Sequence, residues 1–81
     1  MSVVTVQLFA SYADLVGSNT IEVPIRQGDK VSDLLRNMRS LPTASMLPAM
    51  PRVAVNRAFA SEHTVLRASD EIALIPPVSG G

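Results

Sequence analysis

Residues 31–41, VSDLLRNMRSL, constrain the fold most strongly, because this stretch carries the clearest helical pattern in the chain. Its apolar residues recur at positions i, i+3, i+4 and i+7: Val31, Leu34, Leu35 and Met38. This spacing places them on one face of a helix, which one face of a sheet can cover. Asp29 is the expected N-cap, and Pro42 ends the helix because proline lacks the N–H that an interior helical residue donates.

Short runs rich in β-branched residues surround this helix and alternate with period two. We expect strands at residues 2–10, at residues 19–25, on both sides of a tight turn within residues 52–60, and at residues 71–75. The alternation points one set of apolar residues to the core: Val4, Val6, Leu8, Ile21, Val23, Ile25, Val53, Val55, Ile72 and Leu74. Pro24 indicates an edge strand, since proline cannot donate to a ladder. Gly17 closes a short helical turn over residues 11–17.

The order of these elements indicates an α+β fold of the β-grasp (ubiquitin-like) type, with a mixed sheet and one main covering helix. We expect a β-grasp domain at residues 1–75 and an extended C-terminal tail at residues 76–81. The chain has 81 residues, of which 47% are hydrophobic and 17% charged, a composition that supports one folded core.

Residues 42–51, PTASMLPAMP, contain three prolines and no charge. We expect an ordered loop in which Met46, Leu47 and Met50 cover an open edge of the core. A methionine-rich surface for a partner is the alternative reading.

Composition excludes several classes of function. Seven basic residues balance seven acidic ones, which argues against a nucleic-acid partner. No apolar run approaches the ~18 residues of a membrane helix, and no secretory signal is visible, so we expect a cytoplasmic protein without a membrane partner. Cysteine is absent and His63 is the single histidine, so we expect no disulfide, no metal site and no cofactor bound by this chain.

No catalytic constellation is evident inside the domain. Asp70 and Glu71 are adjacent, and neighbours on a strand point to opposite faces. They are therefore better explained as solvated charges in a turn than as a pair of carboxylates for acid/base catalysis. We therefore expect a chain that is not an enzyme on its own. The alternation also places Phe9, Phe59 and Ile75 on the outer face of the sheet, where together they would form a patch for a protein partner. A register slip of one residue would turn them inward instead.

The tail PPVSGG has its own chemistry. Pro76 and Pro77 hold the backbone extended, and the six residues from Pro76 to Gly81 reach roughly 20 Å. Gly80 and Gly81 lack a Cβ atom, so they fit a channel too narrow for other residues. The reactive group at the tip is the α-carboxylate of Gly81, which becomes useful once an enzyme activates it, for example by adenylation.

Four motifs together resemble those of one family. LFASYADLVG near the start, VSDLL in the helix, VAVN in the third strand and DEIALIPPVSGG at the end are similar to the small subunits of molybdopterin synthase. They occur in order across nearly the whole chain. Two departures stand out: the turn after VAVN has Arg57-Ala58 where Gly-Glu is frequent, and Ser69 replaces an expected glycine.

This resemblance implies a β-grasp sulfur carrier. An ATP-dependent partner, similar to ubiquitin-activating enzymes, would adenylate Gly81, and a sulfurtransferase would convert it to a thiocarboxylate. The tail, including Val78 and Ser79, would enter the large synthase subunit and donate sulfur to a cyclic pyranopterin phosphate. The family forms a heterotetramer, and its contact surface beside the tail matches Phe9, Phe59 and Ile75 here.

Three alternatives remain open from the sequence. A carrier for thiazole or cysteine biosynthesis shares the fold and the Gly-Gly end. A ubiquitin-like protein modifier would join Gly81 to lysines of its targets. A plain interaction domain would carry the tail without using it.

Overall fold

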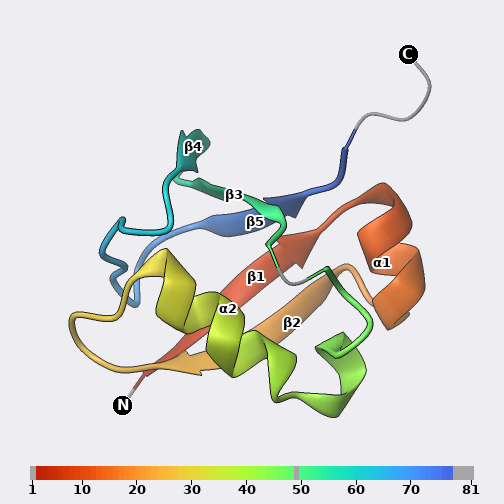
Figure 1. Cartoon of the computed structure of the whole chain (residues 1–81), viewed down its shortest axis with the longest axis horizontal. Helices are drawn as coiled ribbons and strands as arrows, with labels where there is room; N and C mark the ends of the chain where they lie inside the picture. The colour runs from red at the N-terminus through yellow and green to blue at the C-terminus, as the bar shows by residue number, and fades with distance from the viewer. Residues whose placement is uncertain (1, 49, 78–81) are drawn as a thin grey trace.

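The computed structural model describes residues 2–48 and 50–77, which form a five-stranded mixed sheet with one helix across a single face (Figure 1). Its elements are β1 (Ser2–Leu8), α1 (Ala10–Val16), β2 (Thr20–Ile25), α2 (Val31–Arg39), a 3₁₀ turn η1 (Pro42–Ala44), β3 (Arg52–Val55), β4 (Ala58–Ala60) and β5 (Ile72–Ile75). The strand order is β2-β1-β5-β3-β4. Only β1 and β5 are parallel neighbours, and the other three pairs are antiparallel. The predicted β-grasp class is confirmed.

The sheet presents its alternating apolar residues to α2, as predicted. In the edge strand β2 and the interior strands β1 and β5, the inward residues are all buried: Val4, Val6, Leu8, Ile21, Val23, Ile25, Ile72 and Leu74. In β3, Val53 is buried, whereas Val55 is half-buried and packs against the core. Pro24 lies in β2 at the edge of the sheet, where a missing N–H costs no ladder bond.

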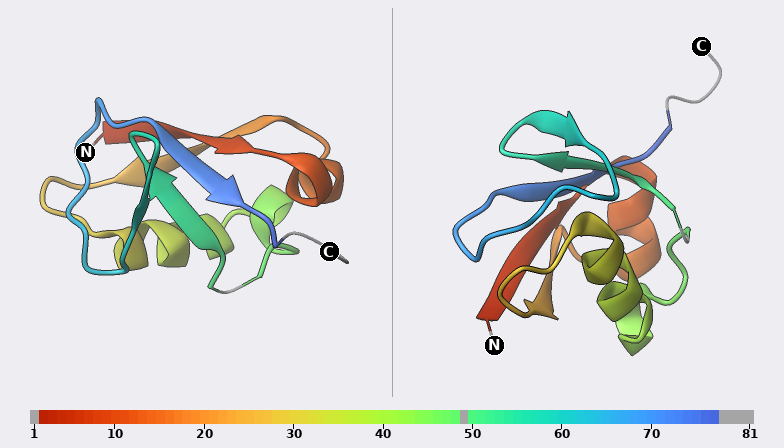
Figure 2. Two further views of the ribbon diagram at one scale, coloured as in Figure 1. Left: turned by 90° about the horizontal axis from the view of Figure 1, so that it is seen from above. Right: turned by 60° about the vertical axis from the view of Figure 1, so that its left-hand side comes forward.

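The helix α2 buries its whole predicted stripe: Val31, Leu34, Leu35 and Met38. Figure 2 shows α2 and the segment that follows it on one side of the sheet. Within the described ranges, no helix is long and apolar enough to cross a membrane.

The start of α2 corrects one prediction, because the N-cap is Lys30 and not Asp29. The Asp29 carboxylate instead accepts the Arg26 N–H at 2.8 Å and closes the preceding turn. At the start of α2, it is the Asp33 carboxylate that accepts the Lys30 N–H, at 2.9 Å. This hydrogen bond lowers the pKa of Asp33 most, burial opposes the shift, and Arg36 at 2.6 Å lowers the pKa further.

The short helix α1 ends as predicted at Gly17, which has a φ of +82° and donates its N–H to Ala13 O at 2.8 Å. Its buried residue is Tyr12, which is 5% exposed and closes one end of the core. The sequence reasoning missed Tyr12, because a seven-residue helix gives too few turns to establish a hydrophobic face.

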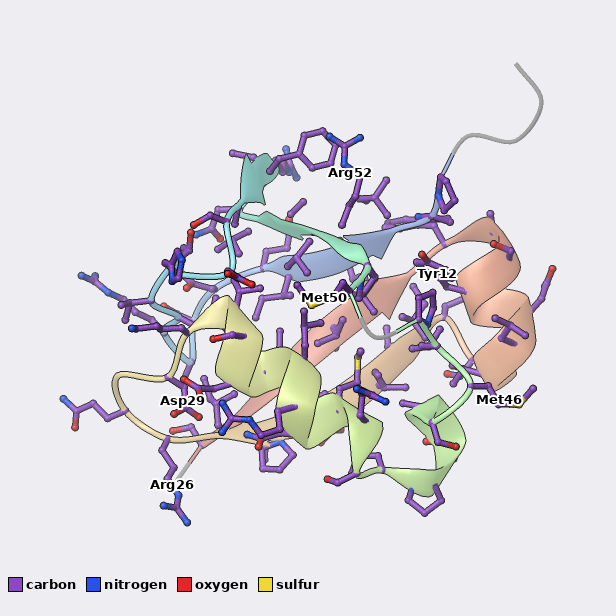
Figure 3. The ribbon with its side chains drawn as sticks, viewed as in Figure 1. Tyr12, Arg26, Asp29, Met46, Met50 and Arg52 are labelled. Atoms are coloured by element: carbon purple, nitrogen blue, oxygen red, sulfur yellow. The ribbon has the colours of Figure 1, made fainter. Side chains whose placement is uncertain are left out.

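The loop over residues 42–51 partly contradicts the prediction made for it. Ala44 and Leu47 are buried, whereas Met46 and Met50 are 66% and 69% exposed. The Leu47 N–H donates to Ala44 O at 3.1 Å, and this tight turn points both residues to the core while Met46 faces outward. Figure 3 shows Met46 and Met50 with the side chains drawn. Leu47 thus covers the core edge as expected, and the two methionines do not.

Candidate functional site

The outer face of the sheet, opposite α2, carries a hollow of about 490 Å³. It is lined by Gln7, Phe9, Ala54, Arg57, Phe59, Glu71, Ala73 and Ile75. These residues come from β1, β3, β4, β5 and the segments next to them. Within the described residues, neither α1 nor α2 covers this face (Figure 2).

The floor of the hollow consists of two alanines. Ala54 of β3 and Ala73 of β5 are directly paired in the sheet, and both are half-buried. Because each side chain is a single methyl group, the sheet surface lies lower here than at its larger neighbours. The sequence reasoning missed this floor, although alanines at outward positions of two neighbouring strands are the signal that predicts it.

The walls are the three outward apolar residues predicted from the alternation. Phe9 is 46% exposed and Phe59 is 63% exposed, while Ile75 is half-buried. The structure therefore brings all three to one hollow, and no register slip turns them inward. Phe59 is paired with Ala54 across β3 and β4, so its ring stands beside the floor.

Local backbone geometry sets the position of Phe9. It follows β1 and serves as the N-cap of α1 with a φ of −128°, and its carbonyl oxygen accepts the Tyr12 N–H at 3.0 Å. Ala10 then turns sharply, with a φ of +46°. The start of α1 therefore holds Phe9 at the end of β1, where the chain leaves the strand.

Arg52 supports Phe59 from the next strand. Its guanidinium carbon lies 4.3 Å from the centre of the Phe59 ring, a cation–π arrangement. Figure 3 shows Arg52 on the side of the sheet away from α2. In the register of β3 and β5, Arg52 is paired with Ile75, the last residue of β5.

The rim at the far end of the hollow is polar. Arg57 Nε lies 3.5 Å from Glu71 Oε1. The turn that carries Arg57 has positive φ at both central residues, +53° at Asn56 and +70° at Arg57. Asn56 holds this turn to the start of β5, because its Oδ1 accepts the Glu71 N–H at 2.9 Å and its Nδ2 donates to Asp70 Oδ1 at 3.1 Å. Asp70 and Glu71 thus lie at a turn, as expected, and the Asn56 side chain makes a solvent-exposed hydrogen bond to each of them.

The tail begins directly beside this hollow. Pro76 is half-buried and Pro77 is exposed, and both follow Ile75. The remaining predicted tail residues, Val78, Ser79, Gly80 and Gly81, lie outside the described residues.

The residues on this face suit contact with another molecule. Apolar walls, a methyl floor, one amide and one exposed ion pair suit the surface of another protein. Among residues 2–48 and 50–77, no group of three or more His, Asp or Glu side chains is placed to hold a metal ion. His63 is exposed, and its Nε2 lies 3.5 Å from Glu62 Oε1.

Comparisons with known proteins give a consistent relationship. The model of the ThiS family matches residues 6–81. The molybdopterin synthase sulfur carrier subunit of Dictyostelium discoideum is 32% identical over 78 residues, which cover 91% of each chain. The resemblance predicted from the four sequence motifs is confirmed.

Solved structures share the fold over nearly the whole chain. SAMP1 from Haloferax volcanii, a small archaeal modifier protein, has a TM-score of 0.81 and 30% identity, covering 99% of this chain and all of that one. A complex of subunits 1 and 2 of the molybdopterin-converting factor from Helicobacter pylori contains a chain with a TM-score of 0.68 and 20% identity, covering 98% of this chain and 99% of that one. The second likeness is one of fold alone.

Proposed function

This chain belongs to the ThiS family, and on that basis we propose that it is the sulfur-carrier small subunit of a molybdopterin synthase. The observation that carries the proposal is the 32% identity, over 91% of both chains, to a subunit of that name. The large synthase subunit is the proposed stable partner.

In the proposed reaction, the Gly81 carboxylate attacks the α-phosphate of ATP within an adenylating partner, and pyrophosphate leaves. A sulfurtransferase then supplies sulfur, so that a carbon–sulfur bond forms at Gly81 while the bond to AMP breaks. The resulting thiocarboxylate donates its sulfur inside the large subunit, where two successive transfers build the dithiolene of molybdopterin. Activation is required because a free carboxylate is a poor electrophile.

In this proposal, the hollow is the surface that binds the large subunit. Phe9, Phe59 and Ile75 line one hollow, and Ile75 directly precedes the tail, so a partner that packs on them is also in position to receive the tail. Apolar contact of this kind provides affinity without chemistry, while the tail supplies the reacting atom. The large subunit is the occupant that we propose for this face.

Intact-mass measurement of the chain isolated from its own cells tests the reaction. We expect a population heavier by the exchange of one oxygen for sulfur, absent from a variant that lacks Gly81. The matched control is Ser79→Ala, which keeps the Gly-Gly end and should still acquire sulfur. An unmodified mass, with ATP and a sulfur donor present, would contradict the proposal.

A second candidate function is protein modification, favoured by the 30% identity to SAMP1. In that case Gly81 would be joined to amines of target proteins, and the product would be higher-mass conjugates rather than a reversible complex. Denaturing electrophoresis with an epitope-tagged chain distinguishes the two, because only covalent conjugates survive denaturation.

A further inference from the structure

The two edge strands of the sheet, β2 and β4, differ in how their outward main-chain groups are used. Figure 1 shows them at opposite borders of the sheet. An edge strand presents N–H and C=O groups that no neighbouring strand satisfies, and such groups can take up a strand from another chain. In an antiparallel pair, successive residues direct these groups alternately toward the partner strand and away from it. The register therefore identifies the groups that face outward.

At the β2 edge, the first outward residue is satisfied by a neighbouring side chain. The Leu8 N–H donates to Asn19 O at 2.7 Å, so the odd-numbered residues of β2 face β1 and the even-numbered residues face outward. Thr20 is the first of these outward residues. The Ser18 hydroxyl accepts the Thr20 N–H at 3.3 Å and donates to Thr20 O at 2.9 Å, so both groups are occupied.

The same closure continues along β2. Pro24 has no N–H, and its C=O accepts Asn37 Nδ2 at 2.9 Å. Just beyond the strand, the Arg26 N–H donates to Asp29 Oδ2 at 2.8 Å, and the Asp29 N–H donates to Arg26 O at 3.0 Å. In the part of the chain that the structure describes, Glu22 alone keeps both outward groups of this edge free. A single free residue between two closed neighbours offers an incoming strand little to bind.

The β4 edge is open. The Asn56 N–H donates to Glu71 O at 2.7 Å, so the even-numbered residues of β3 face β5 and the odd-numbered residues face β4. Phe59 is paired with the even-numbered Ala54, and its own N–H and C=O therefore point away from β3. Among residues 2–48 and 50–77, neither group has a hydrogen-bond partner.

A hollow of about 280 Å³ lies along this open edge, between β4 and α2, and we call it the edge hollow. Its lining is mostly apolar and includes Val31 and Leu35 of α2, Met50 of the loop before β3, and Phe59 and Ala60 of β4. Phe59 also lines the hollow on the outer face of the sheet. Because side chains of a strand alternate between faces, an extended segment beside β4 would direct every second side chain to the edge hollow.

We propose that an extended segment of the large synthase subunit adds to β4 as a further strand of the sheet. The proposal rests on the proposed function, because it takes the large subunit as the partner. The N–H and C=O of Phe59 would form the main-chain hydrogen bonds, and an apolar side chain of the segment would occupy the edge hollow. Continuity with the outer hollow favours this occupant, since a partner that covers Phe59 there also reaches the edge.

A second copy of this chain suits the edge less well. The strand β4 has three residues, Ala58–Ala60, so two copies paired edge to edge would share only a short ladder. Stable protein interfaces bury about 1,200–2,000 Å², which such a ladder does not approach. Pairing of two copies would also cover Phe59 and block the surface proposed for the large subunit.

The first test removes one main-chain donor and leaves every side chain in place. Phe59 is replaced by its α-hydroxy acid, which turns the amide into an ester without an N–H, and Glu22 is replaced in the same way as the matched control. Both N–H groups point outward at an edge strand, so neither ester removes a hydrogen bond between strands. Circular dichroism checks the fold, and calorimetry with the large subunit measures Kd.

We expect the Phe59 ester to raise the Kd about two- to tenfold, the range for one lost hydrogen bond, and the Glu22 ester to leave it unchanged. The second test compares Met50→Lys with Met46→Lys. The two side chains are 69% and 66% exposed in the same loop, but only Met50 borders the edge hollow. Met50→Lys should raise the Kd by about tenfold or more, because binding would bury the new charge, and Met46→Lys by less than about twofold.

Equal affinities of the two esters would overturn the inference, and so would equal affinities of the two lysine variants. Dimers of the free chain in sedimentation, abolished by the Phe59 ester, would assign the edge to a second copy and overturn it as well. A wild-type chain that does not bind the large subunit would contradict the proposed function itself. The wild-type Kd therefore separates failure of the proposed function from failure of strand addition.

Discussion

Replacement of Arg57 by glycine should stabilise the protein, although it removes a side chain that lines the hollow. Arg57 has a φ of +70°, a left-handed conformation that costs a residue with a Cβ atom about 1–2 kcal/mol. Glycine avoids this cost but loses roughly 0.5–1 kcal/mol through its greater freedom in the unfolded chain. The Arg57–Glu71 pair, 3.5 Å apart with Arg57 89% exposed, contributes at most about 0.5 kcal/mol.

These contributions leave a net stabilisation of about 0.5 kcal/mol, which raises the melting temperature by roughly 2–4 °C in a domain of this size. Urea unfolding followed by circular dichroism measures the change. Arg57→Ala is the matched control, because it removes the same ion pair but keeps the Cβ atom and the strained φ. We expect the glycine variant to be more stable than the alanine variant by about 1 kcal/mol.

Equal stability of the two variants would refute the reasoning, since it would mean that the turn stores no strain at Arg57. Both variants should bind the large subunit more weakly than wild type does, because both remove the cation at the rim. Arg57 would then be a residue that reduces stability in order to serve binding.

Three further predictions concern the core, the hollow and the helix start. Leu34→Ala should lower the free energy of unfolding by about 2–5 kcal/mol because it leaves a cavity under the sheet, while the exposed Met46→Ala should change it by no more than about 0.5 kcal/mol in the same urea titration. Ala73→Phe should fill the floor of the hollow and weaken binding to the large subunit by about tenfold or more, measured by calorimetry, with an unchanged urea midpoint as evidence that the fold is intact. The pKa of Asp33 is lower in the folded chain than in the unfolded one, so its contribution to stability is present above the ordinary carboxyl value of about 3.9 and is lost as the pH falls through the folded-state pKa. Asp33→Asn should therefore lose less stability than wild type between pH 5 and about pH 2, and an identical acid profile would contradict this.

Much of the fold follows from periodicity. The stripe of α2, the inward residues of four strands and the edge position of β2 were all predictable, because helix and strand repeats differ and each element has one apolar face. The outward placement of Phe9, Phe59 and Ile75 followed from the same alternation. The errors at Asp29 and at the two methionines arose where turns rather than repeats set the direction of a side chain.

The sequence by itself determined the order of the elements, the helix stripe, the faces of the strands and the family to which the chain belongs. These properties are local or are carried by residue identity, so neighbouring positions suffice to define them. The tertiary structure alone decided that Ala54 and Ala73 meet as a floor, that Arg52 stacks on Phe59, and that Lys30 lies at the end of the sheet away from the tail. Each depends on strand order and register between segments distant in the chain, and hydrogen bonding between strands sets these only when the sheet has formed.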